Sequence, residues 1–202
     1  MDRRNKLFEI ASNRMFSALN AFYIWKIIGQ SINIHQEGGE EKANENLEWI
    51  INKYPSFFQQ TIINSYKTFV CDLAIFFDAG KYESFSLHKL IEIASEKENN
   101  LLEIKSQIQE IKKPHGKLIS LIIRLRNQDV AHQALNPEQH HIIYKEVEDL
   151  FVAVQKILNL LSEYHDRSWT VWDHLEKEME GDISWIFENL KRGEKQRLKG
   201  IE

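Results

Sequence analysis

The chain of 202 residues has the length of one ordinary domain with an appendage, and its composition excludes several structural classes. Its 8 glycines and 3 prolines exclude collagen-like and Pro/Gly-rich disordered chains and disfavour a turn-rich β fold. The net charge of -4 excludes a generally basic polyanion binder, so any contact with nucleic acid must come from a local patch.

The first three predicted helices occupy the N-terminal part of the chain. Apolar residues recur at helical spacing from Leu7 to Ile28 and predict one long helix. The segment Glu40–Tyr54 carries a sparser apolar face and predicts a second helix. Pro55 then favours the first turn of a third helix that runs toward Asp78.

Shorter apolar repeats follow in the middle of the chain. Ser86 is a typical N-cap for a short helix over residues 87–93, and the apolar spacing over residues 101–111 predicts the next helix. Pro114 interrupts this pattern, and a helix with one apolar side is predicted from His115 to about Ala134.

The longest predicted helix comes next, from Glu138 to about His165, and we expect it to form the centre of the bundle together with the helix before it. We divide the chain into a helical bundle over residues 1–165 and an accessory helical segment over residues 166–202 that packs on it. This segment holds three tryptophans that are more typical of packing residues than of base-stacking platforms: Trp169, Trp172 and Trp185.

The composition also bears on the cellular compartment. No apolar run is long enough to span a membrane, and the N-terminal residues lack the apolar core of a signal peptide. The single cysteine, Cys71, cannot form an internal disulfide and lies in an apolar stretch that is typical of a small buried residue. We therefore expect a cytoplasmic protein that has no membrane partner.

The largest local charge asymmetry lies between Ile111 and Gln128, a segment without any acidic residue. Lys112 and Lys113 also lie where the dipole of a helix end favours cations, so a structural interpretation of this pair stays open. The basic residues between Lys191 and Lys199 are interpreted as a solvated tail. In an acidic chain the first segment is a candidate phosphate-facing surface, and its candidate substrate-binding residues are Lys113, Lys117 and Arg124.

The run from Arg126 to His132 places an arginine and a histidine six positions apart, with Asn127 after the arginine and Ala131 before the histidine. This run resembles the Arg-x(4 to 6)-His signature of the HEPN superfamily, whose helical-bundle members include many metal-independent ribonucleases of toxin and antiphage systems. A second match to the bare pattern, Arg167 to His174, lacks the flanking asparagine and alanine.

Two upstream segments extend the resemblance. Asp72–Asp78 and Ser86–Leu90 are similar to the aliphatic-aromatic-Asp and Ser-Leu-x-x-Leu segments of the abortive-infection branch of the HEPN superfamily. The resemblance covers the chain from about Leu7 to about residue 160. It implies an all-α, HEPN-like bundle of long antiparallel helices with a short C-terminal helical appendage.

Cleavage of RNA without a metal needs one group that moves the proton of the 2′-hydroxyl and a fixed cation for the charge that builds on the phosphate. His132 suits the first role because an unperturbed imidazole has a pKa of roughly 6.5. Arg126 suits the second because a guanidinium stays charged and offers planar donors to phosphate oxygens. Asn127 can orient either partner or bind the phosphate. This set of residues predicts no metal and no cofactor.

The spacing of the motif has a consequence for assembly. In a regular helix, six positions separate Arg126 and His132 by about 120° around the axis, so the two side chains do not share one narrow face. The resemblance implies a pair of chains whose two motifs line one cleft, and we expect a homodimer built around the helix from His115 to Ala134. Asp129 departs from the expected pattern, since it is a carboxylate inside the motif. It could raise the pKa of His132 by pairing with it, or it could face water.

The resemblance therefore implies a toxin or antiphage ribonuclease whose substrate is RNA. The alternative is a catalytically inactive HEPN-like module that binds nucleic acid or a protein and dimerises through the same groove. A structural interpretation of the motif also remains, in which Arg126 snorkels from the bundle and His132 is favoured by a helix C-terminus. An antitoxin protein is a further candidate partner.

Overall fold

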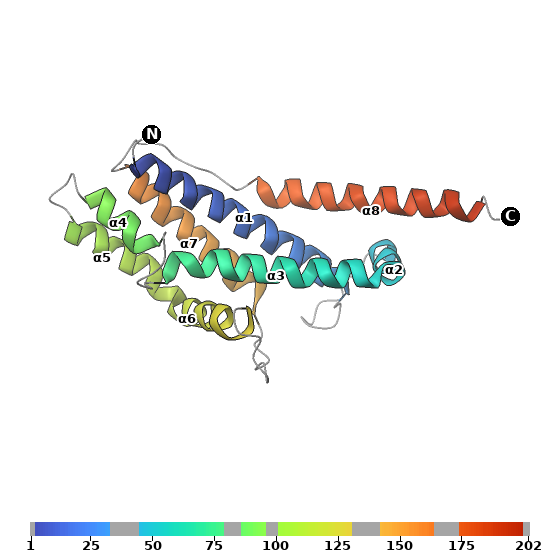
Figure 1. The fold of residues 1–202 in the computed structure, drawn as a ribbon, viewed down its shortest axis with the longest axis horizontal. Coiled ribbons are helices and arrows are strands. Elements are labelled where there is room, and N and C mark those ends of the chain that lie inside the picture. Colours follow the sequence, from blue (N-terminus) through green and yellow to red (C-terminus); the bar gives the residue numbers. More distant parts are fainter. Residues whose placement is uncertain are drawn as a thin grey trace. The chain divides into compact units, whose positions relative to one another are not determined.

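The computed structural model describes residues 3–32, 45–78, 86–95, 101–130, 142–163 and 174–199, and within these ranges the chain forms helices and no strand. This confirms the predicted all-α class. The α-helices, shown in Figure 1, are α1 (Arg3–Ile32), α2 (Glu45–Lys53), α3 (Pro55–Phe77), α4 (Leu87–Ser95), α5 (Leu101–Lys112), α6 (Gly116–Leu125), α7 (Tyr144–Glu163) and α8 (Leu175–Lys199).

The chain divides into two compact units. Unit 1 comprises Met1–Leu19 and Lys67–Trp172, and unit 2 comprises Asn20–Tyr66 and Asp173–Glu202. Helices α1 and α3 therefore contribute residues to both units. The domain boundary that we predict at residue 165 lies outside the described residues and stays a prediction.

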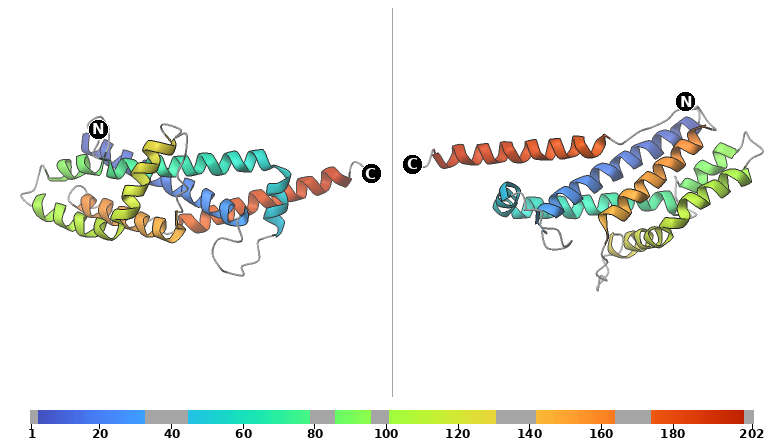
Figure 2. Two further views of the ribbon diagram at one scale, coloured as in Figure 1. Left: turned by 90° about the horizontal axis from the view of Figure 1, so that it is seen from below. Right: turned by 180° about the vertical axis from the view of Figure 1, so that it is seen from behind.

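Local sequence signals set several helix ends. Pro55 is the first residue of α3, one residue after the end of α2. Proline suits this position because it lacks an N–H, and the N–H groups of a first turn have no partner within the helix. Ser86 caps α4, and its Oγ accepts a hydrogen bond from the backbone N of Lys89 at 3.4 Å. Pro114 lies in the 3-10 turn Lys113–His115, which joins α5 to α6. Both ribbon figures show α6 leaving the direction of α5 at this turn (Figures 1 and 2).

Helices α6 and α7 differ in how they are buried within unit 1. Helix α7 contacts α4 and α5 and is buried over most of its length, at Val147, Leu150, Phe151, Ala153, Val154, Ile157, Leu158, Asn159 and Leu161. Helix α6 buries one side only, through Leu118, Ile119, Ile122 and Leu125. The predicted central position is thus correct for α7 and wrong for α6.

The N-terminus of α7 also differs from the prediction. Ile142 and Ile143 are not helical, and the carbonyl of Ile143 accepts hydrogen bonds from the backbone N of Glu146 and of Val147 at 3.1 and 3.3 Å. The helix therefore begins at Tyr144 and not at Glu138, because these bonds form its first turn.

The core of unit 2 brings α8 together with α1, α2 and α3. The rings of Phe58 and Phe187 stack with their centroids 5.2 Å apart and an interplanar angle of 10°. Ile183 and Phe187 are the buried apolar residues that α8 contributes, and the remaining buried members are Ile28, Ile50 and Ile51. This apolar face holds a helix that is otherwise rich in charge.

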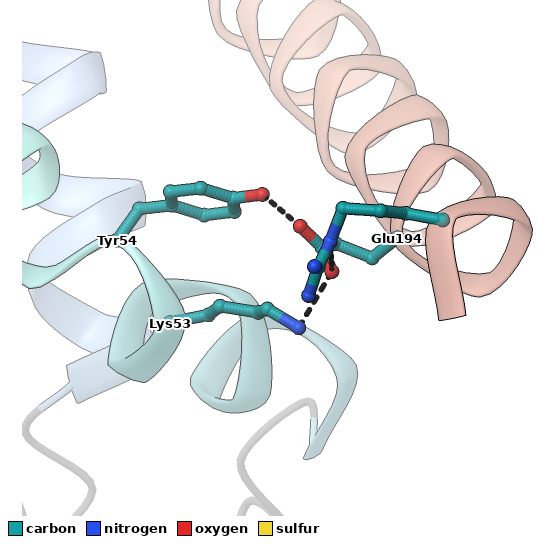
Figure 3. A network of polar contacts seen from close by, with 4 residues as sticks. Lys53, Tyr54 and Glu194 are labelled. Carbon is teal, nitrogen blue, oxygen red and sulfur yellow. Dashed lines mark hydrogen bonds and ion pairs between the residues drawn. The ribbon is translucent and has the colours of Figure 1, made fainter. Parts of the chain in front are cut away.

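Glu194 of α8 is buried beside the junction of α2 and α3, with 6% of its surface exposed. Its carboxylate binds the Lys53 ammonium at 2.6 Å and the Nε of Arg197 at 3.1 Å, and it accepts a hydrogen bond from the hydroxyl of Tyr54. The hydrogen bonds from Lys53 and then from Tyr54 lower the pKa of Glu194 to about 2. Figure 3 shows Tyr54 and Lys53 pointing toward this carboxylate from one side.

One prediction for the C-terminal segment is wrong. Trp185 is 69% exposed and therefore does not pack in a core, whereas Trp169 and Trp172 lie outside the described residues. The basic residues from Lys191 to Lys199 belong to α8, and four of the five are exposed to solvent as predicted, although Arg197 among them also holds Glu194.

Candidate functional site

Helix α6 carries a basic face on the side opposite its buried one. Lys117 and Arg124 are seven positions apart, which is about two helical turns, so they lie on one side of the helix. Lys113 lies four positions before Lys117, in the 3-10 turn. All three side chains are exposed. The segment therefore presents three cations over roughly 16 Å, at about 1.5 Å per residue.

The motif begins where the regular helix ends. A π turn, Arg126–Val130, follows α6 directly, so the predicted regular helix is wrong over these five residues, and the rest of the predicted helix up to Ala134 lies outside the described residues. Such turns are rare and are often found at functional sites because they displace side chains from the α-helical register. His132 and the side chain of Asp129 lie outside the described residues, so their predicted roles stay predictions.

Arg126 is held by a carboxylate from a distant part of the chain. Its Nη2 donates a hydrogen bond to Oδ2 of Asp78, the residue that directly follows α3. The Arg126 side chain is 17% exposed and that of Asp78 is 21% exposed. The guanidinium is therefore ordered by an ion pair at the surface and is not sealed in the core.

Asn127 is a second partner of the Arg126 guanidinium. Its Oδ1 accepts hydrogen bonds from Nε and Nη2 of Arg126, at 3.1 and 3.0 Å. Because the side-chain oxygen of Asn127 is engaged in this way, its Nδ2 remains the end that can donate to a ligand. Asn127 and Gln128 are both exposed. Arg126 and Asn127 thus form one polar group at the end of the basic face.

A second polar network fixes α3 one and a half turns before Asp78. Asp72 is buried, with 5% of its surface exposed, and it accepts hydrogen bonds from Arg14 and from Oγ of Ser17 of α1, the latter at 2.6 Å. Burial raises the pKa of the neighbouring Cys71 thiol, and the charge of Asp72 raises it further. The C-terminal part of α3 is therefore anchored to α1, which gives Asp78 a rigid support.

Lys112, the last residue of α5, contacts the residue before Asp78. Its Nζ lies 5.6 Å from the ring centroid of Phe77, and burial lowers the pKa of the Lys112 ammonium. The side chain of Lys113 is 73% exposed and lies 3.9 Å from Glu110. Lys112 is therefore the last residue of a helix, as the structural interpretation of the pair predicted, while Lys113 is exposed in the 3-10 turn.

Among the predicted site residues, the structure brings Arg126 and Asn127 into direct contact, places Lys117 and Arg124 on one side of α6, and leaves Lys113 exposed in the 3-10 turn before it. The residue that the sequence analysis did not assign to the site is Asp78. The aliphatic-aromatic-Asp segment was a signal for it, but a carboxylate after a helix end is equally expected from helix termination.

Comparison with protein families matches residues 5–184 to the HEPN-type abortive-infection family described as AbiU2. The chain belongs to this HEPN AbiU2 family. The resemblance to the abortive-infection branch of the HEPN superfamily is thereby confirmed. Comparison with curated proteins and with solved structures gives no match. In the part of the chain that the structure describes, every helix is too short or too polar to cross a membrane.

Proposed function

We propose that this HEPN AbiU2 domain is a metal-independent endoribonuclease of the toxin or antiphage type, with Arg126, Asn127 and His132 as its catalytic residues. The observation that carries the proposal is the position of the Arg126–Asn127 pair. This pair is ordered by Asp78 at the end of the basic segment 111–128, which contains no acidic residue of its own, and the histidine of the motif follows within a few positions.

The proposed chemistry assigns one step to each group. The 2′-oxygen of the RNA attacks the neighbouring phosphorus while His132 accepts its proton, and the bond from phosphorus to the 5′-oxygen breaks. The proton passes to the leaving 5′-oxygen, so the products are a 2′,3′-cyclic phosphate and a 5′-hydroxyl. Arg126 and Asn127 stabilise the negative charge that builds on the phosphate oxygens.

Lys113, Lys117 and Arg124 extend the proposed site along the RNA backbone. Exposed cations in a row attract successive phosphates without reading sequence, and their contribution falls as salt is added. In the proposed homodimer the basic faces of both chains border one cleft, so that a single-stranded RNA contacts both motifs. An antitoxin would cover the same face.

The proposal is tested by cleavage of a labelled single-stranded RNA by the full chain. Arg126→Ala and His132→Ala should each abolish cleavage and leave the helical circular dichroism unchanged. The matched control is Lys195→Ala, which removes an exposed cation of α8. EDTA should not inhibit, and the 5′ fragment should end in a cyclic phosphate. Undiminished cleavage by Arg126→Ala, or loss of cleavage in EDTA, would contradict the proposal.

One observation favours the alternative function, a binding module without catalysis. Asp78 engages the guanidinium of Arg126, and a carboxylate in that position competes with a phosphate for the same donor. If Asp78 instead positions Arg126 for catalysis, Asp78→Asn should lower the cleavage rate at least tenfold without weakening RNA binding. In a binding module, the same substitution should tighten RNA binding, and neither protein should cut.

A further inference from the structure

We propose that the exposed face of α8 binds a second copy of this chain, with the two α8 helices side by side and antiparallel. The surface lies within unit 2 and does not depend on the proposed ribonuclease function. It is distinct from the cleft around α6, because it consists of residues of α8 alone.

The proposed contact face is a stripe of six exposed residues along α8. Successive members are alternately four and three positions apart, which is the heptad spacing that keeps side chains on the seam between two packed helices. The stripe faces away from Ile183 and Phe187, which bury the opposite side of α8 in the core of unit 2. Its members are Glu178, Asp182, Trp185, Asn189, Arg192 and Gln196.

The stripe is symmetric in sequence about position 187, which is the height along the helix axis at which Phe187 lies on the opposite side. Asp182 and Arg192 each lie five positions from it, and Trp185 and Asn189 each lie two positions from it. In an antiparallel pair with a two-fold axis at this level, Asp182 of each copy faces Arg192 of the other copy. The same operation places each Trp185 opposite an Asn189. One stripe is therefore complementary to itself.

The charges of α8 agree with this arrangement. Residues 175–182 contain four acidic residues and one lysine, whereas residues 191–199 contain five basic residues and one glutamate. The helix dipole accounts for charges in the first and last turns, but Asp182 and Arg192 lie farther inside the helix. Within the chain Arg192 contacts Glu188 at 3.3 Å, and both side chains are more than half exposed. Such an exposed pair is weak, so Arg192 can turn to a second copy.

The centre of the stripe supplies apolar surface. Trp185 is 69% exposed and the adjacent Ile186 is 52% exposed, and both line a depression of about 380 Å³ beside Tyr54. A Cβ added at Gly181 or Gly193 would meet nothing within 4 Å, so the described chain places no neighbour there. These two glycines allow a second backbone to approach α8 closely, and a central tryptophan is a typical anchor of an interface.

The inference is tested by sedimentation over a range of protein concentrations and by co-purification of tagged with untagged chains. Trp185→Ala should weaken self-association through α8 at least tenfold. Asp182→Arg and Arg192→Asp should each prevent pairing of identical chains through α8, because like charges then face one another, while a dimer through the proposed α6 cleft would not be affected. A mixture of these two variants should pair, since each arginine of one chain then faces an aspartate of the other.

Lys195→Asp is the matched control, because it makes the same charge change as Arg192→Asp on an exposed part of α8 outside the stripe. It should pair like the unmodified chain. Circular dichroism should be equal for all variants, since the substituted side chains are exposed. Tagged Asp182→Arg chains that capture untagged Asp182→Arg and Arg192→Asp chains equally would overturn the inference. An unmodified chain that stays monomeric at every concentration would overturn it as well.

Discussion

The two units each contain a carboxylate that joins distant parts of the chain, but the two carboxylates differ in what surrounds them. In unit 2, Glu194 is held by Lys53, Tyr54 and Arg197, and its side chain is 7% exposed. In unit 1, Asp78 holds Arg126, and these side chains are 21% and 17% exposed. Three donors satisfy the first carboxylate, whereas the second orders a cation beside the exposed Asn127.

This difference separates a structural network from a candidate site. A buried carboxylate whose two oxygens both accept hydrogen bonds from its own chain offers little to a ligand and mainly fixes α8 against α2. A guanidinium that is ordered from one side and accompanied by exposed donors is already oriented for a phosphate. The same ion-pair chemistry thus serves packing in unit 2 and, we propose, RNA cleavage in unit 1.

The largest effect on stability is expected from Phe187→Ala in unit 2. This substitution removes a buried ring that stacks on Phe58, and we expect the free energy of unfolding to fall by about 3–5 kcal/mol. Urea unfolding followed by circular dichroism measures the change. The control Lys195→Ala should stay within about 0.5 kcal/mol of the unmodified chain. Equal stabilities for the two variants would show that this core does not hold α8.

A conservative change at Arg126 should affect unit 1 in the opposite way, with little effect on the fold and a large one on cleavage. The substitution Arg126→Lys keeps the positive charge, but an ammonium lacks the planar set of donors with which the guanidinium binds Asp78 and Asn127 together. We expect the cleavage rate to fall by about 100-fold to 1000-fold, as is typical for loss of one electrostatic donor. Arg124→Lys is the matched control and should retain most of the rate. Comparable losses for both variants would indicate that Arg126 contributes no more to cleavage than the other cations of the basic face.

The comparison also predicts a pH dependence for unit 2. The pKa of Glu194 is about 2 in the folded chain and roughly 4.3 for an unperturbed glutamate, so its contribution to stability is fully present above about pH 4.3. That contribution should be lost as the pH falls toward about 2, because protonation then weakens the bonds to Lys53 and Tyr54. The difference in melting temperature between the unmodified chain and Glu194→Gln should therefore shrink across this window. A difference that stays constant with pH would contradict the assignment.

The smallest effect is expected from Ser86→Ala, which removes the N-cap of α4 in unit 1. The loss should be about 1 kcal/mol, the typical value for an N-cap. RNA cleavage below the melting temperature should not change, because Ser86 is not part of the proposed site. If cleavage fell as stability fell, the effects at Arg126 could not be separated from loosening of unit 1.

Much of the fold followed from local patterns. Apolar spacing predicted the helices, Pro55 and Ser86 predicted two helix starts, and the run around Arg126 together with Asp72–Asp78 predicted the family. These signals are readable because helix formation and capping depend on residues within a few positions of one another. The start of α7 at Tyr144 was missed because the apolar pattern does not reveal where the first turn is bonded.

The candidate site was predicted only in part. Arg126, Asn127 and the basic face of α6 were identified from the sequence, whereas the pairing of Arg126 with Asp78 was not. The π turn at Arg126 was also missed, since the residue pattern of that segment is compatible with a regular helix. Trp185 was expected in a core because tryptophan is usually buried, but the face of α8 that carries it points to solvent.

The sequence by itself determined the helical class, most helix positions and the resemblance to the abortive-infection branch of the HEPN superfamily, since these depend on periodicity and on short motifs. Tertiary structure alone decided which carboxylate holds Arg126 and which cations hold Glu194. The partners in these contacts are separated by 48 residues for Arg126 and Asp78 and by 140 residues for Tyr54 and Glu194. Contacts across such distances depend on how the helices pack, and helical periodicity specifies which face of a helix is buried but not which residue it meets.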